Sequence, residues 1–209
     1  MKAILKPVSP KLCEKVISGE CTLLLSKIKP KLDPPFKEYI YCTKGNREAL
    51  WYWKGEWYYD IRFPEERPNR ANSKVIGEFV CDRMYGVAIT GVFENGEQLP
   101  IDILKQSCLT VSEFHNYVGI KNCYGWHISE LKIYDKPKEL REFISTVRCK
   151  KFEDYMVDCD YNCRSYHAYS YLTACGMEDE SECMSKGHKP ITRAPQGWCY
   201  VEELEGKGK

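Results

Sequence analysis

Five cysteines gather in one short stretch of the chain, and thiolates at this density can hold a metal ion. They are Cys149, Cys159, Cys163, Cys175 and Cys183, with His167 and His188 in the same stretch. Tetrahedral Zn²⁺ takes four Cys or His ligands and orders a segment too polar to build its own core. We expect a zinc site whose preferred ligands are Cys149, Cys159, Cys163 and Cys183, with Cys175 in reserve. The alternative is a loop that keeps its thiols reduced.

A cysteine can also serve as a nucleophile, and Cys21 activated by His127 is the pair to consider. The sequence does not bring these two side chains within hydrogen-bond reach of each other. A single cysteine near a helix terminus is more often a small packing residue. We therefore expect Cys21 to be chemically inert, and we expect the same of the scattered cysteines at 13, 42, 81, 108, 123 and 199.

Two other features are typical of nucleic-acid binding without chemistry. Residues 1–47 carry ten Lys or Arg against four acids, a local charge of +6 in a chain whose net charge is +1. Such a region attracts phosphate, although it can equally be a solvated face. Trp126 and Trp198 could stack on bases, although large aromatic residues in short strands are usually buried.

The composition is that of a globular protein. The chain has 209 residues, 43% hydrophobic and 29% charged, which suits one core with an appendage. The first residues lack the apolar stretch of a secretory signal, so we expect a cytoplasmic protein with reduced cysteines. Aromatic and β-branched clusters favour strands over long helices. We therefore expect an α+β protein.

Local signals place the elements. Residues 2–8 are predicted to form a strand, and Ser9-Pro10 then begins a helix that ends before Gly19. Further strands are expected at 21–28, 36–43, 74–82, 87–93, 126–134 and 198–201, with a hairpin at 50–63 that turns at Lys54-Gly55. The Thr110-x-x-Glu113 capping box predicts a short helix to Tyr117, and a brief helix is expected over 136–143. Residues 148–190 lack periodicity and are taken as a Cys-rich insertion, and residues 206–209 as a frayed tail.

Several segments, in this order, resemble ASCH-domain proteins of the kind found in bacteriophages and prophages. They are the first strand and helix, the turn at Gly19, and residues 39–43 (YIYCT), 75–82 (VIGEFVCD), 124–129 (YGWHIS) and 194–202 (APQGWCYVE). The resemblance implies a PUA-like small mixed β-barrel over 1–147 and 191–205, with a cleft beside the first helix. It also implies a role around RNA or nucleotides.

The signature of that family, Gly-x-Lys-x-x-Glu-x-Arg, falls on Gly19, Cys21, Leu24 and Ser26 of this chain, so only the glycine matches. Cysteine, leucine and serine cannot replace the proton transfer and the forked hydrogen bonds of the family's lysine and arginine. Alternation along a strand would point Lys27 and Lys29 away from the cleft. We therefore expect no catalytic residues there, and a ligand site formed by Cys21, Leu24, Ser26, Trp126, His127 and Trp198.

Three functions stay open. The favoured one is a PUA-like module that binds RNA or a nucleotide without changing it. The second is a ribonuclease or nucleoside amidohydrolase with a rearranged active site. The third is a phage-type protein that binds a host (defence) protein through its apolar Leu23-Leu24-Leu25 segment or its Cys-rich insertion.

Overall fold

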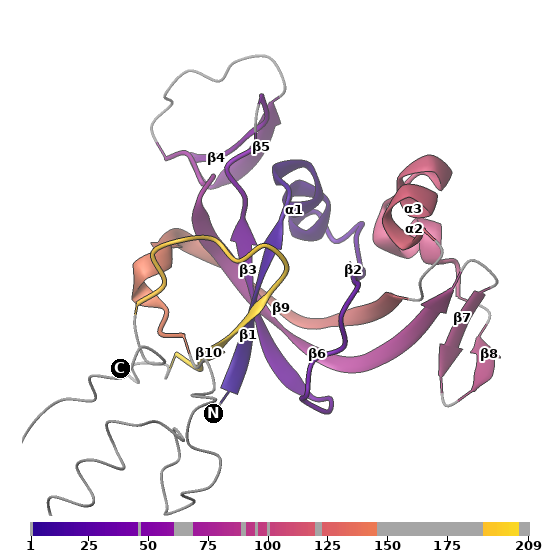
Figure 1. Ribbon diagram of the computed structural model, residues 1–209. Coiled ribbons are helices and arrows are strands. Elements are labelled where there is room, and N and C mark those ends of the chain that lie inside the picture. Colours follow the sequence, from indigo (N-terminus) through magenta and orange to yellow (C-terminus); the bar gives the residue numbers. More distant parts are fainter. Residues whose placement is uncertain are drawn as a thin grey trace, which may run out of the picture.

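The computed structural model describes residues 2–45, 47–60, 69–88, 91–94, 96–99, 101–119, 123–145 and 190–204. Ten strands and a few short helices make up these ranges, which confirms a mixed α+β fold (Figure 1). No helix among the described residues is long and apolar enough to cross a membrane. Apart from Pro190, the Cys-rich insertion over 148–190 lies outside the described residues.

The central part of the sheet is built from segments far apart in the sequence. Strand β1 (Lys2–Val8) pairs in parallel with β3 (Phe36–Cys42), and on its other side antiparallel with β10 (Cys199–Glu202). Strand β3 in turn pairs antiparallel with β6 (Lys74–Ala88). The chain therefore brings its beginning and its end together in neighbouring strands.

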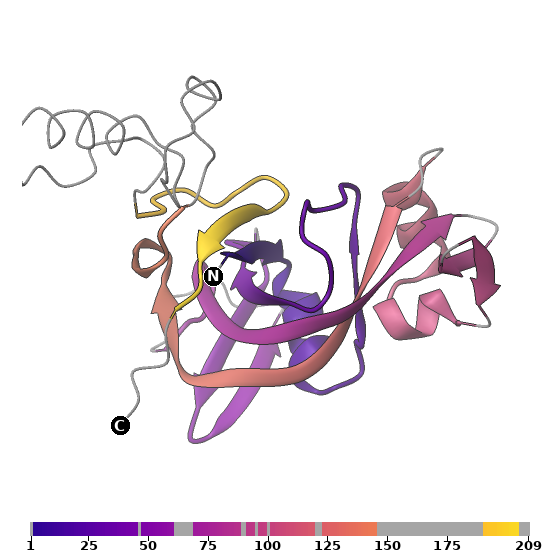
Figure 2. The ribbon, with the colours of Figure 1, turned by 90° about the horizontal axis from the view of Figure 1, so that it is seen from below.

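Two long strands carry the curvature of the sheet (Figure 2). Strand β6 pairs with β9 (Cys123–Glu139) from Lys74 to Val87, with register shifts that mark irregularities in the ladder. Gly77 lies at one of these shifts. A side chain does not fit there, because a Cβ at position 77 would be 2.6 Å from the carbonyl oxygen of Lys132. Strand β2 (Leu23–Ser26) adds to β9, and β7 (Gly91–Glu94) and β8 (Glu97–Leu99) extend the far end of β6.

No closed barrel is detected among the described strands, so the expected PUA-like β-barrel stays a prediction. The order of the sheet is β10-β1-β3-β6-β7-β8, with β9 and β2 branching from β6. Within these ranges no hydrogen-bonded pair joins β2 to β10, so the edge strands are not sealed to each other. A barrel needs such a pairing around its whole circumference.

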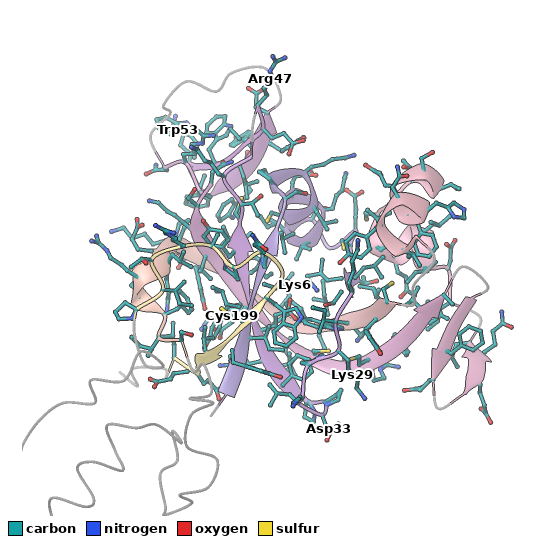
Figure 3. The ribbon with its side chains drawn as sticks, in the orientation of Figure 1. Lys6, Lys29, Asp33, Arg47, Trp53 and Cys199 are labelled. Carbon is teal, nitrogen blue, oxygen red and sulfur yellow. The ribbon has the colours of Figure 1, made fainter. Side chains whose placement is uncertain are left out.

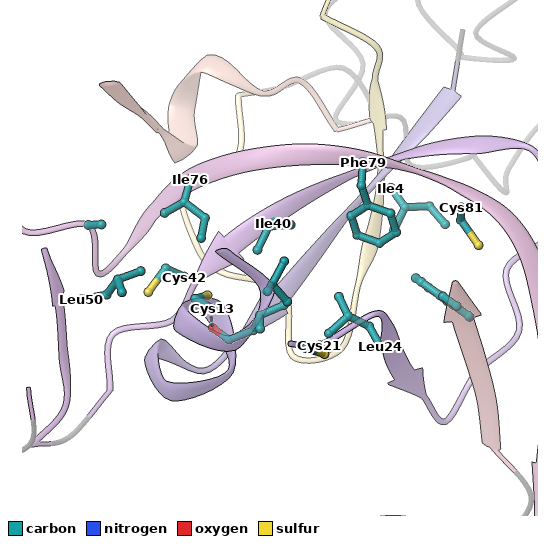
Figure 4. Packing of buried hydrophobic residues seen from close by; sticks show 14 of the residues in the cluster. Ile4, Cys13, Cys21, Leu24, Ile40, Cys42, Leu50, Ile76, Phe79 and Cys81 are labelled. Carbon is teal, nitrogen blue, oxygen red and sulfur yellow. Dashed lines mark hydrogen bonds between the residues drawn. The ribbon is translucent and has the colours of Figure 1, made fainter. Parts of the chain in front are cut away.

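Helix α1 (Pro10–Ile17) covers the concave side of the sheet (Figure 1). The Ser9 hydroxyl oxygen accepts the Leu12 N–H as N-cap, and Gly19 follows the helix with φ +75°. Cys13 and Val16 face the sheet in a cluster of fully or nearly buried residues (Figure 4). Its members are Ile4, Val8, Cys13, Val16, Cys21, Leu24, Phe36, Ile40, Cys42, Leu50, Ala71, Ile76, Phe79, Cys81 and Trp126.

Two further clusters cover the rest of the sheet. Leu5, Tyr39 and Phe143 belong to the one on the opposite face, beside the 3₁₀ turn η1 (Leu140–Glu142). Helices α2 (Ile103–Ser107) and α3 (Val111–Val118) follow β8, and α3 contributes Phe114 and Val118 to the other cluster. The capping box at Thr110 is as predicted, and the helix ends at Val118, one residue beyond Tyr117, with Gly119 as its C-cap.

The hairpin of β4 (Ala49–Trp53) and β5 (Glu56–Asp60) forms a separate two-stranded sheet and turns at Lys54-Gly55, as predicted. The helix expected over 136–143 is wrong. Strand β9 instead runs to Glu139, because Lys138 and Glu139 pair with Val75 and Lys74 of β6. Only the single turn η1 follows.

Candidate functional site

A cleft of about 610 Å³ opens beside α1, between β1, β2 and the segment before β10. This volume is within the range of small-molecule sites. Four stretches of chain line it: residues 6–9 with Leu12, residues 23–28, the helical region with Ser107, Leu109 and Tyr117, and residues 196–198. Most of these side chains are apolar, so a charged group among them stands out.

The buried charged residue of the lining is Lys6, which belongs to β1 (Figure 3). Alternation along β1 explains its position, because Ile4 and Val8 face the main cluster while Leu5 faces the opposite one. Lys6 is therefore on the core side of a strand buried on both faces, and it is only 6% exposed. Its ammonium has no hydrogen-bond partner within the described part of the protein.

Burial and an aromatic ring set the properties of this lysine. The Lys6 Nζ lies 3.7 Å from the centroid of the Trp126 ring, a cation–π contact. Removal from water lowers the pKa of Lys6 to about 8, and the charge of nearby Glu38 offsets part of that effect. The ammonium is thus still the main form at neutral pH.

Glu38 is the second buried ionisable group. It points to the same side of β3 as Phe36 and Ile40, and none of its surface is exposed. Burial raises its pKa to about 8, against the opposing influence of Lys6, and neither carboxyl oxygen has a partner in the described residues. Glu38 is not among the residues that line the cleft. Near neutral pH it is mostly protonated, so Lys6 has no full counter-charge.

The mouth of the cleft carries aromatic side chains. Trp198 lines it and lies 6.1 Å, centroid to centroid, from Trp126, and its Nε1 donates to the carbonyl oxygen of Ile28. Tyr117 lines it from α3, with the Lys27 Nζ 5.1 Å from its ring centroid. Lys27 therefore faces the cleft, contrary to the alternation argument, because β2 already ends at Ser26.

The six expected ligand residues divide into three groups. Leu24, Ser26 and Trp198 line the cleft. Trp126 is fully buried beneath Lys6. Cys21 and His127 do not line it, and the ligand contacts of all six stay predictions.

Cys21 and His127 are each engaged elsewhere. The Cys21 thiol contacts the Leu23 carbonyl oxygen at 3.5 Å, and burial raises its pKa to about 12. His127 Nδ1 lies 2.6 Å from Asp82 Oδ1, and this hydrogen bond lowers the pKa of Asp82 against the opposing effect of burial. A thiol with so high a pKa is a poor nucleophile, and the inertness of Cys21 stays a prediction.

The four expected zinc ligands, Cys149, Cys159, Cys163 and Cys183, and the reserve Cys175 lie outside the described residues. Across the described ranges there is no group of three Cys, His, Asp or Glu side chains that could hold a metal ion. The zinc site therefore stays a prediction, and elemental analysis of freshly purified protein tests it.

Sequence reasoning counted Lys6 only as part of the basic region, and it missed Glu38. A signal for both was present. Each is a charged residue between two apolar ones at alternate positions, Ile4-x-Lys6-x-Val8 and Phe36-x-Glu38-x-Ile40. The intervening residues are apolar in the first segment (Leu5 and Pro7) but include Lys37 in the second, so the signal is clearer for Lys6. Charged residues on a strand that is buried on both faces are rarely accidental.

The described residues form an α+β protein with an open, curved sheet and a cleft beside α1. No family model and no curated protein matches the sequence. Among solved structures, it is similar to ASCH from Zymomonas mobilis, with a TM-score of 0.43 and 11% identity over 66% of this chain and 73% of that one. The similarity to a point mutant of that protein has a TM-score of 0.44 and 13% identity, over 67% of this chain and 77% of that one. The likeness is one of chain path at low identity, and membership of the ASCH family stays a prediction.

Proposed function

We propose that this chain binds RNA or a nucleotide in the cleft beside α1 and does not turn it over. The observation that carries the proposal is Lys6, which lines the cleft and whose ammonium is buried without a hydrogen-bond partner in the described residues. A buried cation without a partner costs free energy unless something anionic satisfies it. A phosphate group of a ligand would supply that partner.

The rest of the cleft suits the other parts of a nucleotide. Its apolar walls can take the faces of a base or a sugar, and Trp198 at the mouth offers a ring for stacking. The ASCH-like segments of the sequence imply the same class of ligand. The proposal also makes this chain a phage-type member of the ASCH family in which the ionic residues of the family signature have been replaced.

The signature positions argue against turnover. Cys21, Leu24 and Ser26 are all nearly fully buried, and the Ser26 hydroxyl donates to the carbonyl oxygen of Ile28. None of these groups can transfer a proton near neutral pH, since the pKa of Cys21 is raised to about 12 by burial. The proposed binding therefore uses Lys6, the apolar walls of the cleft and the Trp198 ring, and it needs no proton transfer.

One observation favours the hydrolase alternative. Burial brings the pKa values of both Lys6 and Glu38 to about 8, which is close to the range in which a general acid or base works best. Loss of RNA or nucleoside turnover in both Lys6→Met and Glu38→Gln would establish that alternative. Binding without turnover by the wild-type protein would exclude it.

The host-protein alternative loses one of its two surfaces. Leu23, Leu24 and Leu25 are 0%, 1% and 8% exposed, so they offer no apolar surface to a partner. The other surface, the Cys-rich insertion, lies outside the described residues. Salt-insensitive co-purification of a host protein is the observation that would favour this function.

The proposed function is tested by titrating a short single-stranded RNA, labelled with a fluorophore, against the protein at several salt concentrations. We expect affinity to fall with salt, and the Lys6→Met variant to show a slope smaller by roughly 0.7, the value for one phosphate contact on a single strand. Lys44→Met is the matched control, because Lys44 is an exposed lysine away from the cleft. Equal slopes for the two variants would contradict the proposal.

A further inference from the structure

One residue of the cleft lining and one beneath it carry polar groups that the described residues leave unsatisfied. The Lys6 ammonium and the Trp126 indole N–H are both buried, and neither has a hydrogen-bond partner within the ranges described. Because the great majority of buried polar groups are paired, each such group needs an explanation, such as a water or a ligand. The two lie together, since the Lys6 Nζ is 3.7 Å from the centre of the Trp126 ring.

Of the four hydroxyl groups that line the cleft, three are already used as donors within the protein, and the fourth, on Ser9, is exposed and accepts the Leu12 N–H. Those of Ser26, Ser107 and Tyr117 donate to the carbonyl oxygens of Ile28, Ile103 and Leu25, at 2.9, 2.6 and 3.1 Å. They are therefore poor donors to a ligand. Lys6 is left as the buried group in the lining that can bind an anion.

The lining of the cleft carries positive charge at two residues. Its charged residues are Lys6 and Lys27, and Lys27 is exposed at the mouth. Beside Lys6, the fully buried Glu38 would add negative charge if it ionised. One buried positive charge can balance one negative charge, and a second negative charge there would be buried without a partner.

We propose that the inner end of the cleft takes one singly charged phosphodiester group, at Lys6, and discriminates against a phosphomonoester. This inference rests on the proposed function and specifies its ligand. A phosphodiester carries one negative charge, whereas a phosphomonoester carries about 1.5 to 2 at neutral pH because its second pKa is near 6. The ligand is thus an internal RNA linkage or a cyclic mononucleotide rather than a nucleoside 5′-monophosphate.

The test compares three ligands by isothermal titration: a nucleoside, its 5′-monophosphate and the corresponding dinucleoside monophosphate with free ends. At about pH 7.5 we expect the diester to bind roughly tenfold more tightly than the monoester, the ratio that corresponds to about 1.4 kcal/mol. At about pH 5 the monoester has lost its second charge, so the ratio of the two affinities should fall to about one. This change arises in the ligand and needs no variant.

The Lys6→Met variant then tests whether Lys6 is the residue that binds the phosphodiester. The variant should bind the diester about 10- to 100-fold more weakly, as expected for the loss of a hydrogen bond to a charged group, and it should bind the nucleoside as the wild type does. Its circular dichroism serves as the folding control. Lys44→Met should retain the wild-type preference for the diester.

The outcomes separate this inference from the proposed function. If the monoester binds as tightly as the diester at both pH values, or more tightly, the phosphodiester site is wrong while nucleotide binding stands. If RNA and all three ligands fail to bind, the proposed function fails, and the phosphodiester site with it. An unchanged diester affinity in Lys6→Met would move the site away from Lys6.

Discussion

Lys6 and Glu38 project from neighbouring parallel strands onto the same buried side of the sheet. The register of β1 and β3 sets Ile4 opposite Glu38 and Lys6 opposite Ile40, so the two charged residues are diagonal neighbours. Both are at least nine-tenths buried, and each acts electrostatically on the pKa of the other. We therefore expect this pair to make the stability of the protein depend on pH, in addition to its role in the proposed ligand binding.

The pair gives stability an unusual dependence on pH. The pKa of Glu38 is raised from 4.5 to about 8, so the folded state holds a proton that the unfolded state loses, and stability should fall as pH rises from about 4.5 to about 8. The pKa of Lys6 is lowered from 10.5 to about 8, so stability should recover between about pH 8 and pH 10.5. Urea unfolding across this range should show a minimum near pH 8.

Glu38→Gln separates the two contributions. At about pH 5 the variant should match the wild type, and near pH 8 it should be more stable by on the order of 3–5 kcal/mol, since each pKa unit is worth about 1.4 kcal/mol. Lys6→Met should remove the recovery above pH 8. Parallel curves of unfolding free energy for the wild type and Glu38→Gln would show that Glu38 does not titrate in this way.

Trp198 should contribute to binding through its ring. Trp198→Ala is expected to weaken RNA binding by about 1–3 kcal/mol, the range measured for stacking of one base on an aromatic side chain. Trp198→Phe should retain most of the affinity. Trp53→Ala serves as control, because Trp53 is 42% exposed on β4 and does not line the cleft. Equal losses in the Trp198→Ala and Trp53→Ala variants would point to a general effect rather than to stacking in the cleft.

Cys21 should be unreactive in the folded protein. Burial raises the pKa of its thiol to about 12, so very little thiolate is present at pH 8. In native protein treated with iodoacetamide, mass spectrometry should find Cys21 unmodified, and it should become modified once urea unfolds the chain. Rapid native alkylation of Cys21, or RNA turnover abolished by Cys21→Ala, would restore it as a nucleophile.

The capping box of α3 should be worth a measurable amount of stability. The Thr110 Oγ1 accepts the Glu113 N–H at 3.2 Å, and the Glu113 carboxylate accepts the Thr110 N–H at 2.8 Å. Thr110→Ala should lower the free energy of unfolding by about 1 kcal/mol. Ser112→Ala, at an exposed position of the same helix, should change it far less, and a similar loss in both variants would argue against the cap.

Local signals predicted the elements whose cause is local. Ser9-Pro10 and Gly19 bound α1, Lys54-Gly55 turns the hairpin, and Thr110 caps α3, because each signal acts within a few residues along the chain. The lengths of β6 and β9 were not predictable in the same way. Each strand continues beyond its own apolar pattern because the other supplies its hydrogen bonds.

The residues of the candidate site also differ in whether the sequence could predict them. Leu24, Ser26 and Trp198 were found from the signature and the aromatic pattern, whereas Lys6 was assigned to a solvated basic region. Net charge by segment cannot distinguish a lysine on the surface from one in the core. The distinction comes from Trp126, which lies 120 positions later in the chain and reaches Lys6 only through the path β1-β3-β6-β9.

The most direct test of the account is the pKa of Lys6 with and without ligand. The ¹³Cε resonance of Lys6, assigned by its disappearance in Lys6→Met, reports this value in a pH titration. The free protein should give a pKa of about 8, and bound RNA should raise it, because a phosphate beside the ammonium stabilises the charged form. An unchanged pKa in the complex would place the phosphate elsewhere and contradict the assignment of this cleft as the binding site.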